Sequence, residues 1–422
     1  MEALGVVLFA LLILGSVCLH EAGHMLTAKR FGMKVTRYFV GFGPTLWSFR
    51  RGETEYGVKA LPLGGFVKIV GMTPQDDDVA PADESRAMWR FPVWKRTVVM
   101  SAGSVTHFVI GFVLLWITAS FIGLPNPKWE TFLNSDEATL NGSKPYVQVA
   151  SCLPRATTST TCDPTAAAAK KAGLRSGDLI TSMNGVAVNT YGDLVTLVRT
   201  ARPDTSNPPD AKITYVRDGQ THTVTIPLAT VSRPPLDAPQ SDAVSTYALG
   251  VSPSLPPSEP FNIAYGPIDG ISHAGTYTAT TFVGIGTALK HLPGKVPGLW
   301  NALQGKPRDP NGPISVVGAS ELGGQTVALG EWGFFLLLAA ALNFFVGVLN
   351  LFPLLPLDGG HIAIAWYEKF RAWLARRRRL PEPARVDYYK LVPITNAVIV
   401  ILGAFSLLTI LADIINPINI MQ

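Results

Sequence analysis

The stretch ALGVVLFALLILGSVCLHEAGH, residues 3–24, decides the architecture of this chain. Its first part, Ala3–Leu19, has no charged residue and runs directly into His20-Glu21-Ala22-Gly23-His24. Such a run is typical of a helix that crosses a bilayer, because about 30 Å of hydrocarbon takes roughly 20 helical residues. The stretch therefore predicts a membrane span with two histidines and a glutamate at one end.

Three further uncharged runs follow, at Thr97–Pro127, Trp332–Leu357 and Leu391–Ala412. Hydrophobic residues make up 47% of the 422 residues and charged residues only 15%, whereas soluble domains carry about 25% charged residues. Core helices of a soluble protein are the alternative, but these runs are too long and too free of charge for that class. We expect an α-helical polytopic membrane protein with four transmembrane helices.

The distribution of basic residues predicts the orientation of these spans. Only Met1 and Glu2 precede the first run, which favours an uncleaved span over a signal peptide. Residues 28–96 hold 12 Lys and Arg against 7 Asp and Glu, residues 358–390 hold 8 against 4, and residues 123–329 hold 15 of each. By the positive-inside rule, the two short segments are cytoplasmic, and the long segment and both termini lie outside. The net charge of +5 then reflects membrane anchoring, and we predict no nucleic-acid partner.

The long outside segment shows an organisation of its own. Residues 145–230 predict a compact domain whose elements are strands at Val147–Ala150, Leu179–Met183, Ala211–Val216 and Thr221–Ile226 and a helix at Gly192–Arg199. Asn184-Gly185 and Asp218-Gly219 are typical hairpin turns. Residues 231–260, rich in Pro, Ser and Asp, predict a linker, and the apolar stretch Thr276–Leu289 predicts a helix on the outer membrane surface.

The HExxH pattern of residues 20–24 predicts a metal site. Positions four apart on a helix share one face, so His20 and His24 can bind one Zn²⁺. Glu21 can then act as the general base that takes a proton from zinc-bound water. Ionisable residues at a membrane span are costly to place, which favours a functional role over a polar helix end.

Two histidines leave a zinc site one protein ligand short of the usual three. Asp358 is the first candidate, because it follows the third run at its predicted cytoplasmic end, the same side as His24. His361 is a competing candidate. Pro353 and Pro356 break the helix before Asp358. Such a break is tolerated at membrane depth where the backbone is buried or lines a cavity.

Taken together, these motifs resemble the site-2 protease family of intramembrane zinc metalloproteases, of the RseP type and most like its actinobacterial members. The resemblance covers nearly the whole chain. It rests on the HExxH motif, on Asn350-x-x-Pro353 leading to Asp358-Gly359-Gly360, and on three further stretches: Gly41-Phe42-Gly43-Pro44 with 61–68, Gly173-Leu174 with Gly177-Asp178, and Gly312-Pro313-Ile314-Ser315.

The resemblance implies a division of the chain and a set of roles. The segments are transmembrane helix 1 at 1–28, a membrane-associated β-hairpin segment at 29–96, transmembrane helix 2 at 97–122, an extracytoplasmic α+β PDZ domain at 145–230, a linker and membrane-surface helix region at 231–330, transmembrane helix 3 at 331–357, a basic cytoplasmic loop at 358–390 and transmembrane helix 4 at 391–415. His20, His24 and Asp358 would bind zinc, Glu21 would be the general base, and Asn350 would bind substrate or the oxyanion.

The same resemblance implies regulated intramembrane proteolysis in a bacterial plasma membrane. The substrates would be single-pass membrane proteins such as anti-sigma factors, with remnant signal peptides as another class. The strand within residues 57–70 would pair with an extended substrate. A non-catalytic PDZ receptor is the alternative, and a metal carrier is less favoured because few other ionisable residues lie in the spans.

Two features remain open at this stage. His107 stands in the second run about where relatives have an asparagine, and a hydrogen bond to substrate or to a neighbouring helix is open to it. Cys152 and Cys162 lie in the outside segment, where a disulfide is permitted, with free thiols as the alternative.

Overall fold

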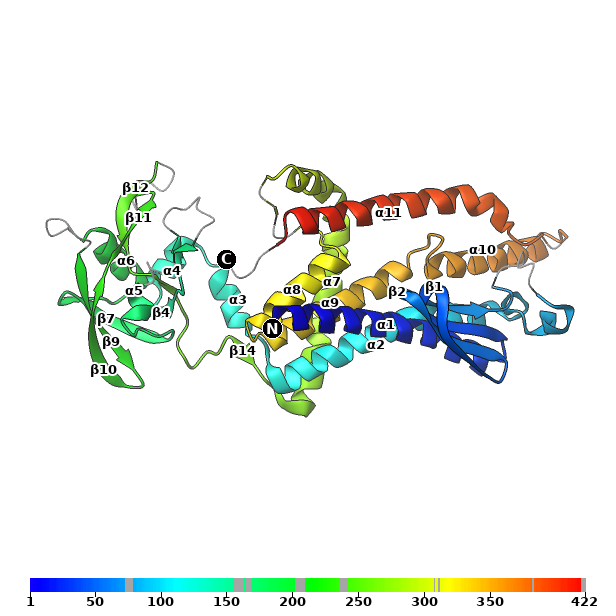
Figure 1. Ribbon diagram of the computed structural model, residues 1–422, viewed down its shortest axis with the longest axis horizontal. Coiled ribbons are helices and arrows are strands. Elements are labelled where there is room, and N and C mark those ends of the chain that lie inside the picture. Colours follow the sequence, from blue (N-terminus) through cyan, green and yellow to red (C-terminus); the bar gives the residue numbers. More distant parts are fainter. Residues whose placement is uncertain are drawn as a thin grey trace. The chain divides into compact units, whose positions relative to one another are not determined.

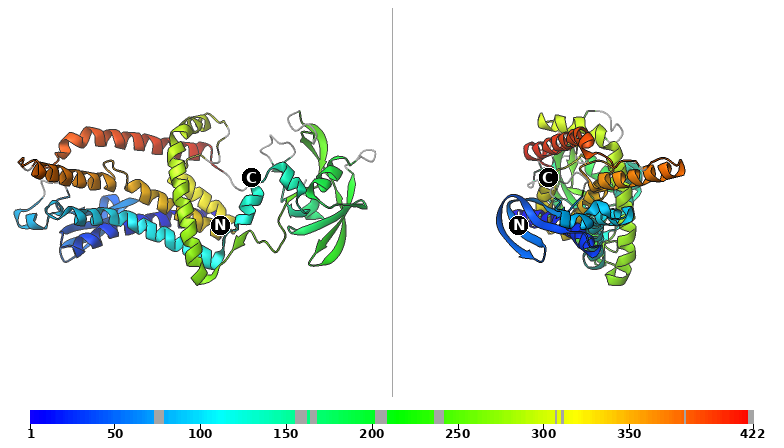
Figure 2. Two further views of the ribbon diagram at one scale, coloured as in Figure 1. Left: turned by 180° about the vertical axis from the view of Figure 1, so that it is seen from behind. Right: turned by 90° about the vertical axis from the view of Figure 1, so that its right-hand side faces the viewer.

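The computed structural model describes residues 1–72, 79–154, 162–163, 168–201, 209–235, 242–306, 308–309, 312–381 and 383–418. The chain divides into two compact units (Figures 1 and 2). Unit 1 comprises Met1–Gly123 and Ala264–Met421, and unit 2 comprises Leu124–Ile263. We describe each unit by itself.

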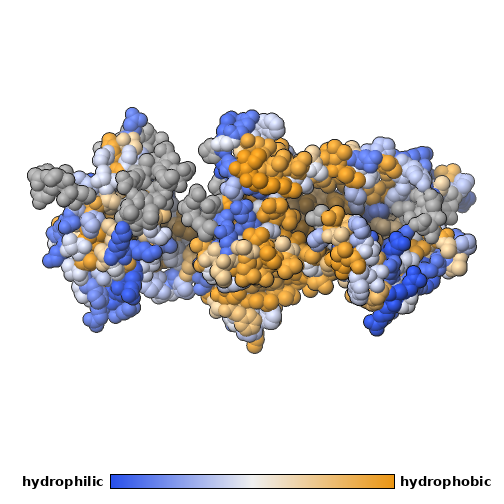
Figure 3. Space-filling model, in the orientation of Figure 1, coloured by the Kyte–Doolittle hydropathy of each residue, from blue (hydrophilic) through white to orange (hydrophobic). Residues whose placement is uncertain are grey.

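Four helices of unit 1 are long and apolar enough to cross a membrane, in the part of the chain that the structure describes. They are α1 (Glu2–Arg30), α2 (Val93–Ile117) with the π-helical turn Thr118–Ile122, α9 (Trp332–Asn350), and α11 (Val392–Ile415) with the 3₁₀ turn Tyr388–Leu391. Large apolar side chains such as Leu11, Val109 and Val400 are exposed on them. Figure 3 shows this hydrophobic surface over unit 1. The four predicted spans are thus confirmed.

Helix α2 lies at the centre of unit 1 and packs against α1, α9 and α10 (Asp358–Arg377). Small residues let the neighbouring helices approach closely. A Cβ atom on Gly5 of α1 would lie 2.8 Å from the Cα of Gly324 in α8 (Val316–Ala328). Helix α7 (Gly266–Leu303) runs across the bundle and contacts α2 and α11 (Figures 1 and 2). The apolar stretch Thr276–Leu289 is therefore helical, as predicted, within a longer helix.

The chain reverses tightly between α9 and α10. Helix α9 ends at Asn350, earlier than the predicted 357, because Pro353 and Pro356 supply no N–H for further helical bonds. A Cβ on Gly359 would lie 2.2 Å from the carbonyl oxygen of Leu351, so only glycine allows this approach. The basic segment expected as a loop is largely helical, because α10 begins at Asp358 directly after the reversal.

Strands β1 (Val35–Arg51) and β2 (Thr54–Ile69) form a long hairpin that curls back on itself. Val40 pairs with Val58 on one side and with Gly65 on the other. Residues 65–69 consequently form an outer edge of this small sheet. Strand β2 also contacts α1, which brings that edge to the HExxH helix.

Unit 2 is built on a six-stranded sheet with the strand order β10-β9-β7-β4-β13 and with β8 paired to β7. The strands are β4 (Tyr146–Val149), β7 (Asp178–Met183), β8 (Val186–Ala187), β9 (Asp210–Arg217), β10 (Gln220–Pro227) and β13 (Val251–Pro253). Helix α6 (Tyr191–Arg199) starts at a capping box of Thr190 and Asp193. The four predicted strands and the predicted helix are confirmed, each within one residue at its start.

The hairpin turns of unit 2 are also as predicted. Asn184 and Gly185 have φ of 53° and 82°, and Asp218 and Gly219 have φ of 50° and 77°. Both central residues of each turn are thus left-handed, as a two-residue hairpin requires. Buried Val147, Ile180, Leu194, Ile213 and Ile226 form the core between sheet and helix.

The predicted linker at 231–260 is wrong in part. Strand β11 (Ala229–Arg233) pairs with β12 (Val244–Ala248), and β13 adds to the main sheet with Val251 opposite Val149. The proline-rich composition misled because Pro253 stands on an edge strand, where a missing N–H costs little. Residues 236–241 of this segment lie outside the described residues. Cys152 is disulfide-bonded, but the side chain of Cys162 lies outside the described residues, so their pairing stays a prediction.

Unit 2 contains a buried ion pair whose removal tests this packing. Asp178 is 1% exposed, and its carboxylate accepts two bonds of 2.7 Å from the guanidinium of Arg217. We expect Arg217→Met to destabilise unit 2 by about 3 kcal/mol, because it leaves a buried carboxylate without its cation. Urea-dependent proteolysis of unit 2 in the full chain measures the change. The matched control is Lys212→Met on the exposed side of β9, and equal midpoints for both variants would contradict the assignment.

Candidate active site

Helix α1 brings His20 and His24 into contact on one face. Their Nε2 atoms are 3.1 Å apart, and the rings meet edge to face with centroids 4.7 Å apart. The two residues are only 7% and 4% exposed. Nδ1 of His24 donates to the carbonyl oxygen of Val99 at 2.7 Å. This bond leaves the lone pair of its Nε2 free to bind a metal.

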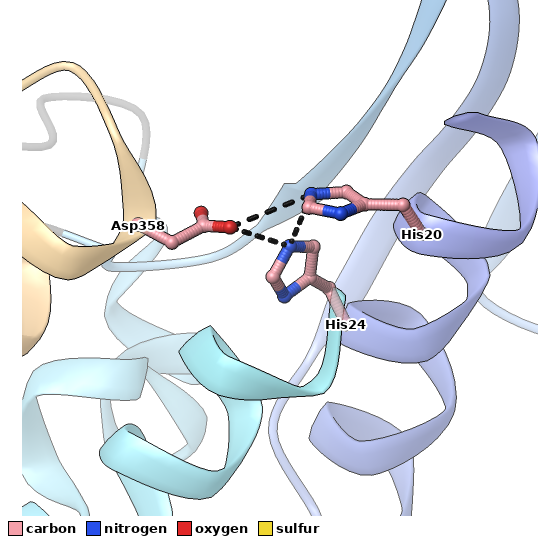
Figure 4. Close-up of side chains that lie close together, drawn as sticks. All are labelled: His20, His24 and Asp358. Carbon is pink, nitrogen blue, oxygen red and sulfur yellow. Dashed lines mark hydrogen bonds and ion pairs between the residues drawn. The ribbon is translucent and has the colours of Figure 1, made fainter. Parts of the chain in front are cut away.

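Asp358, from the second chain segment of unit 1, completes the cluster. At the first residue of α10, its Oδ2 lies 3.4 Å from Nε2 of His20 and 3.3 Å from Nε2 of His24 (Figure 4). Ligands about 2.0 Å from a tetrahedral zinc ion are themselves roughly 3.3 Å apart. Oδ2 of Asp358 is buried and has no hydrogen-bond donor among the described residues. The triangle of three ligand atoms therefore fits zinc in both spacing and chemistry.

Glycines on both helices make room for this arrangement. A Cβ on Gly103 of α2 would lie 2.4 Å from Cε1 of His20, so the imidazole rests directly on the glycine backbone. A Cβ on Gly23 would lie 2.8 Å from the carbonyl oxygen of Ala102. Gly23 is the fourth residue of the HExxH stretch, and it allows α1 and α2 to touch at the level of the site.

Glu21 is held beside the cluster by the edge of β2. Its Oε2 accepts a hydrogen bond of 3.0 Å from the backbone N–H of Val67. This contact fixes one carboxylate oxygen and leaves the other without a hydrogen-bond donor in the described part of the chain. A carboxylate held in this way next to a metal site can accept a proton from a water molecule.

The other two candidate residues, His361 and Asn350, are not among the three clustered ligands. His361 is not part of the ligand triangle; its ring stacks on Tyr388 with centroids 5.9 Å apart. Asn350 is the last residue of α9, half-buried, and makes no side-chain hydrogen bond among the described residues. Asp358 is therefore the third candidate ligand, and Asn350 lies close to it in sequence, across the reversal between α9 and α10.

His107 has a partner that sequence reasoning missed. Its Nδ1 lies 2.9 Å from Oδ1 of Asn343 in α9, and the Asn343 Nδ2 donates to the carbonyl oxygen of Ala339 at 2.9 Å. Nδ1 of His107 therefore donates, and its Nε2 remains an acceptor. The His107 ring centroid is 5.0 Å from that of His20. The signal for Asn343 was a buried amide inside an otherwise apolar span.

Comparisons with known proteins show which proteins this chain is similar to. The family model described as Peptidase family M50 matches residues 8–382. The zinc metalloprotease Rip1 of Mycolicibacterium smegmatis is 41% identical over 429 residues, which cover 100% of both chains. Rip1 of Mycobacterium tuberculosis is 40% identical over 420 residues, 99% of both chains. A putative zinc metalloprotease of Nostoc sp. is 27% identical over 84% of both chains.

The contact between Gly103 and the His20 ring generates a prediction. We expect Gly103→Ala to weaken zinc binding about 10- to 100-fold, because the new methyl group displaces the imidazole from its position. Metal analysis of purified protein after dialysis against graded chelator concentrations measures the effect. Gly15→Ala in α1 is the matched control, since no atom lies within 4 Å of its Cβ position. Equal zinc retention by the two variants would show that Gly103 does not position His20.

Proposed function

The chain belongs to peptidase family M50, the site-2 protease family, and is a multi-pass membrane protein and a zinc metalloendopeptidase; from this premise we propose that it cuts single-pass membrane proteins within the bilayer. The observation that carries the proposal is the buried triangle of His20, His24 and Asp358 with Glu21 beside it. Three of these four side chains come from α1, and the fourth, that of Asp358, comes from the far side of a helix reversal.

In this proposal His20, His24 and Asp358 hold the zinc ion. The ion supplies Lewis-acid polarisation and lowers the pKa of water at the site. The hydrogen bond from His24 to Val99 and the Gly103 surface under His20 orient the two imidazoles. The tight reversal at Gly359 puts Asp358 at the start of α10, where its Oδ2 lies within 3.4 Å of Nε2 of both histidines.

Glu21 is the proposed general base. Its carboxylate accepts the proton of the attacking water and passes it to the leaving amine, which is the usual exchange of roles in peptide hydrolysis. Val67 holds one oxygen of this carboxylate in place. Asn350 is proposed to bind substrate or to donate its amide to the developing oxyanion. The His107 ring lies beside that of His20, and the hydrogen bond from its Nδ1 to Asn343 fixes a tautomer in which Nε2 is an additional acceptor.

The edge of β2 is the proposed place of substrate binding. A strand residue points its N–H to one edge only, and Val67 gives its N–H to Glu21 rather than to β1. The free edge of residues 65–69 therefore faces the catalytic carboxylate. A helical substrate hides its peptide bonds in its own hydrogen bonds, so an unwound segment would pair with this edge by strand addition.

Unit 2 is proposed to be an extracytoplasmic PDZ domain that controls which substrates reach the membrane site. Its small sheet with one capped helix and the Gly177-Asp178 start of β7 support this reading. The proposed location is a bacterial plasma membrane, and the charge distribution supports an orientation with unit 2 and both termini outside. Anti-sigma factors and remnant signal peptides are the proposed substrates.

The general-base role is tested by Glu21→Gln. We expect the variant to keep its zinc and to lose about 10²–10⁴-fold in cleavage rate of a single-span model substrate, because an amide accepts no proton. Cleavage is followed on gels with purified protein in detergent, and zinc is measured on the same samples. The control Glu84→Gln removes a carboxylate that pairs with Arg90 away from the site.

Three outcomes of this experiment are distinct. Loss of cleavage with zinc retained supports Glu21 as the base. Cleavage by Glu21→Gln at the wild-type rate contradicts the mechanism. Zinc binding without cleavage in the wild type, over several single-span substrates, favours the non-catalytic receptor instead.

A further inference from the structure

A cavity of about 190 Å³ lies between the beginning of α2 and the middle of α10. The segment 383–385, which leads towards α11, forms part of its wall. Four of its lining residues are basic, namely Arg96, Lys369, Arg371 and Arg385, and one is acidic, Glu368. It is distinct from the metal-ligand triangle, which shares no residue with it.

Glu368 is the one acid among the described lining residues, and both of its carboxylate oxygens already have partners within the protein. Oε1 of Glu368 accepts a bond of 3.0 Å from the backbone N–H of Val386, and its Oε2 lies 3.6 Å from Nη1 of Arg96. Lys369, Arg371 and Arg385 have no carboxylate partner in the described ranges. Nε of Arg96 is buried and has no hydrogen-bond partner there either. Lys369, Arg371 and Arg385 lie over the rings of Trp366, Tyr367 and Trp89, at 4.7, 5.6 and 5.4 Å from the ring centroids. The described lining of the cavity therefore carries more positive than negative charge, and Glu368 is the one anionic partner that its cations have there.

The cavity also lies at the level of the membrane interface. Arg96 immediately precedes Thr97, the first residue of the uncharged run of α2. On α10, Trp366, Phe370 and Trp373 follow one another at helical spacing and are 47%, 57% and 52% exposed. Exposed aromatic side chains with neighbouring basic residues are typical of a helix in the headgroup region. Trp366 ties the two elements together, since its Nε1 donates to Oγ1 of Thr97 at 3.0 Å.

We propose that this cavity binds a phosphate group, supplied by the headgroup of an anionic phospholipid. Arginine forks match phosphate oxygens and form charge-assisted hydrogen bonds with them. The beginning of α2 adds the positive end of a 25-residue helix. The size of the cavity suits a headgroup rather than acyl chains, which would lie along the exposed aromatic face of α10. Such a lipid bridges α2 and α10, and thus the helix whose first residue is Asp358.

The experiment compares wild-type protein with a double variant of the cavity, Arg371→Gln with Arg385→Gln. Binding of dioctanoyl phosphatidylglycerol to the purified full chain in neutral detergent is measured by titration calorimetry. We expect the double variant to bind about tenfold or more weakly, because each removed charge near the headgroup weakens the attraction. The matched control is Arg378→Gln with Arg379→Gln, which removes the same charge from exposed positions on the same segment and is expected to change affinity less than about twofold.

A variant of opposite sign separates binding from misfolding. Glu368→Gln removes the one acid among the described residues that line the cavity and keeps an acceptor for Val386. We expect it to strengthen lipid binding about threefold, which a folding defect would not produce. The zinc content of every variant is measured as a check that unit 1 is intact.

The competing sources of phosphate are distinguished in the same titration. If inorganic phosphate or glycerol phosphate displaces the lipid at equal concentration, the phosphate site is supported and a lipid occupant is rejected. If dioctanoyl phosphatidylcholine binds as tightly as phosphatidylglycerol, or if both double variants lose affinity equally, the binding is not specific to this cavity and the proposal is overturned.

Discussion

Three buried ligand atoms drawn from two helices are the constraint on which unit 1 depends. Two imidazoles and a carboxylate within 3.4 Å of one another are costly in a low-dielectric interior unless a cation lies between them. The proposed zinc removes that cost and links α1 to α10. Every close approach near the site serves this geometry, from Gly103 under His20 to Gly359 against Leu351.

The carboxylate of Glu21, the proposed general base, is positioned by a different element from those that carry the metal ligands. Glu21 is oriented by the backbone of Val67, and Val67 lies on the edge where an extended substrate would pair. In the proposed mechanism, substrate pairing and base positioning therefore share one strand. Glu21 lies in a helix but is oriented by the edge of a sheet. The N–H groups at a strand edge are available to side chains, whereas those inside a helix bond within the helix.

Much of this organisation is readable from local patterns, because charge-free runs and hairpin turns are determined over short stretches. The four spans and the Asn184-Gly185 turn are of this kind. The HExxH spacing likewise predicts that two histidines share a face. Asp358 was already the first candidate because it follows the third run, but the reversal at Pro353–Gly360 that brings it, rather than His361, to the two histidines is revealed by no periodicity. The pairing of His107 with Asn343 joins residues 236 positions apart. Strand β13 was missed because its pairing with β4 depends on residues far away in sequence.

Helix α10 combines three roles that its sequence separates by position. Its first residue is the proposed metal ligand Asp358, its middle holds Glu368 against Arg96, and its exposed aromatic side chains lie at the interface. Helical rise places Glu368 about 15 Å from Asp358 along the axis. A rigid helix transmits a displacement at one end to the other, so whatever holds the middle of α10 against α2 also holds the carboxylate against the histidines. An anionic headgroup bound at Arg371 and Arg385 would therefore stabilise the arrangement of α10 and α1 that binds the metal.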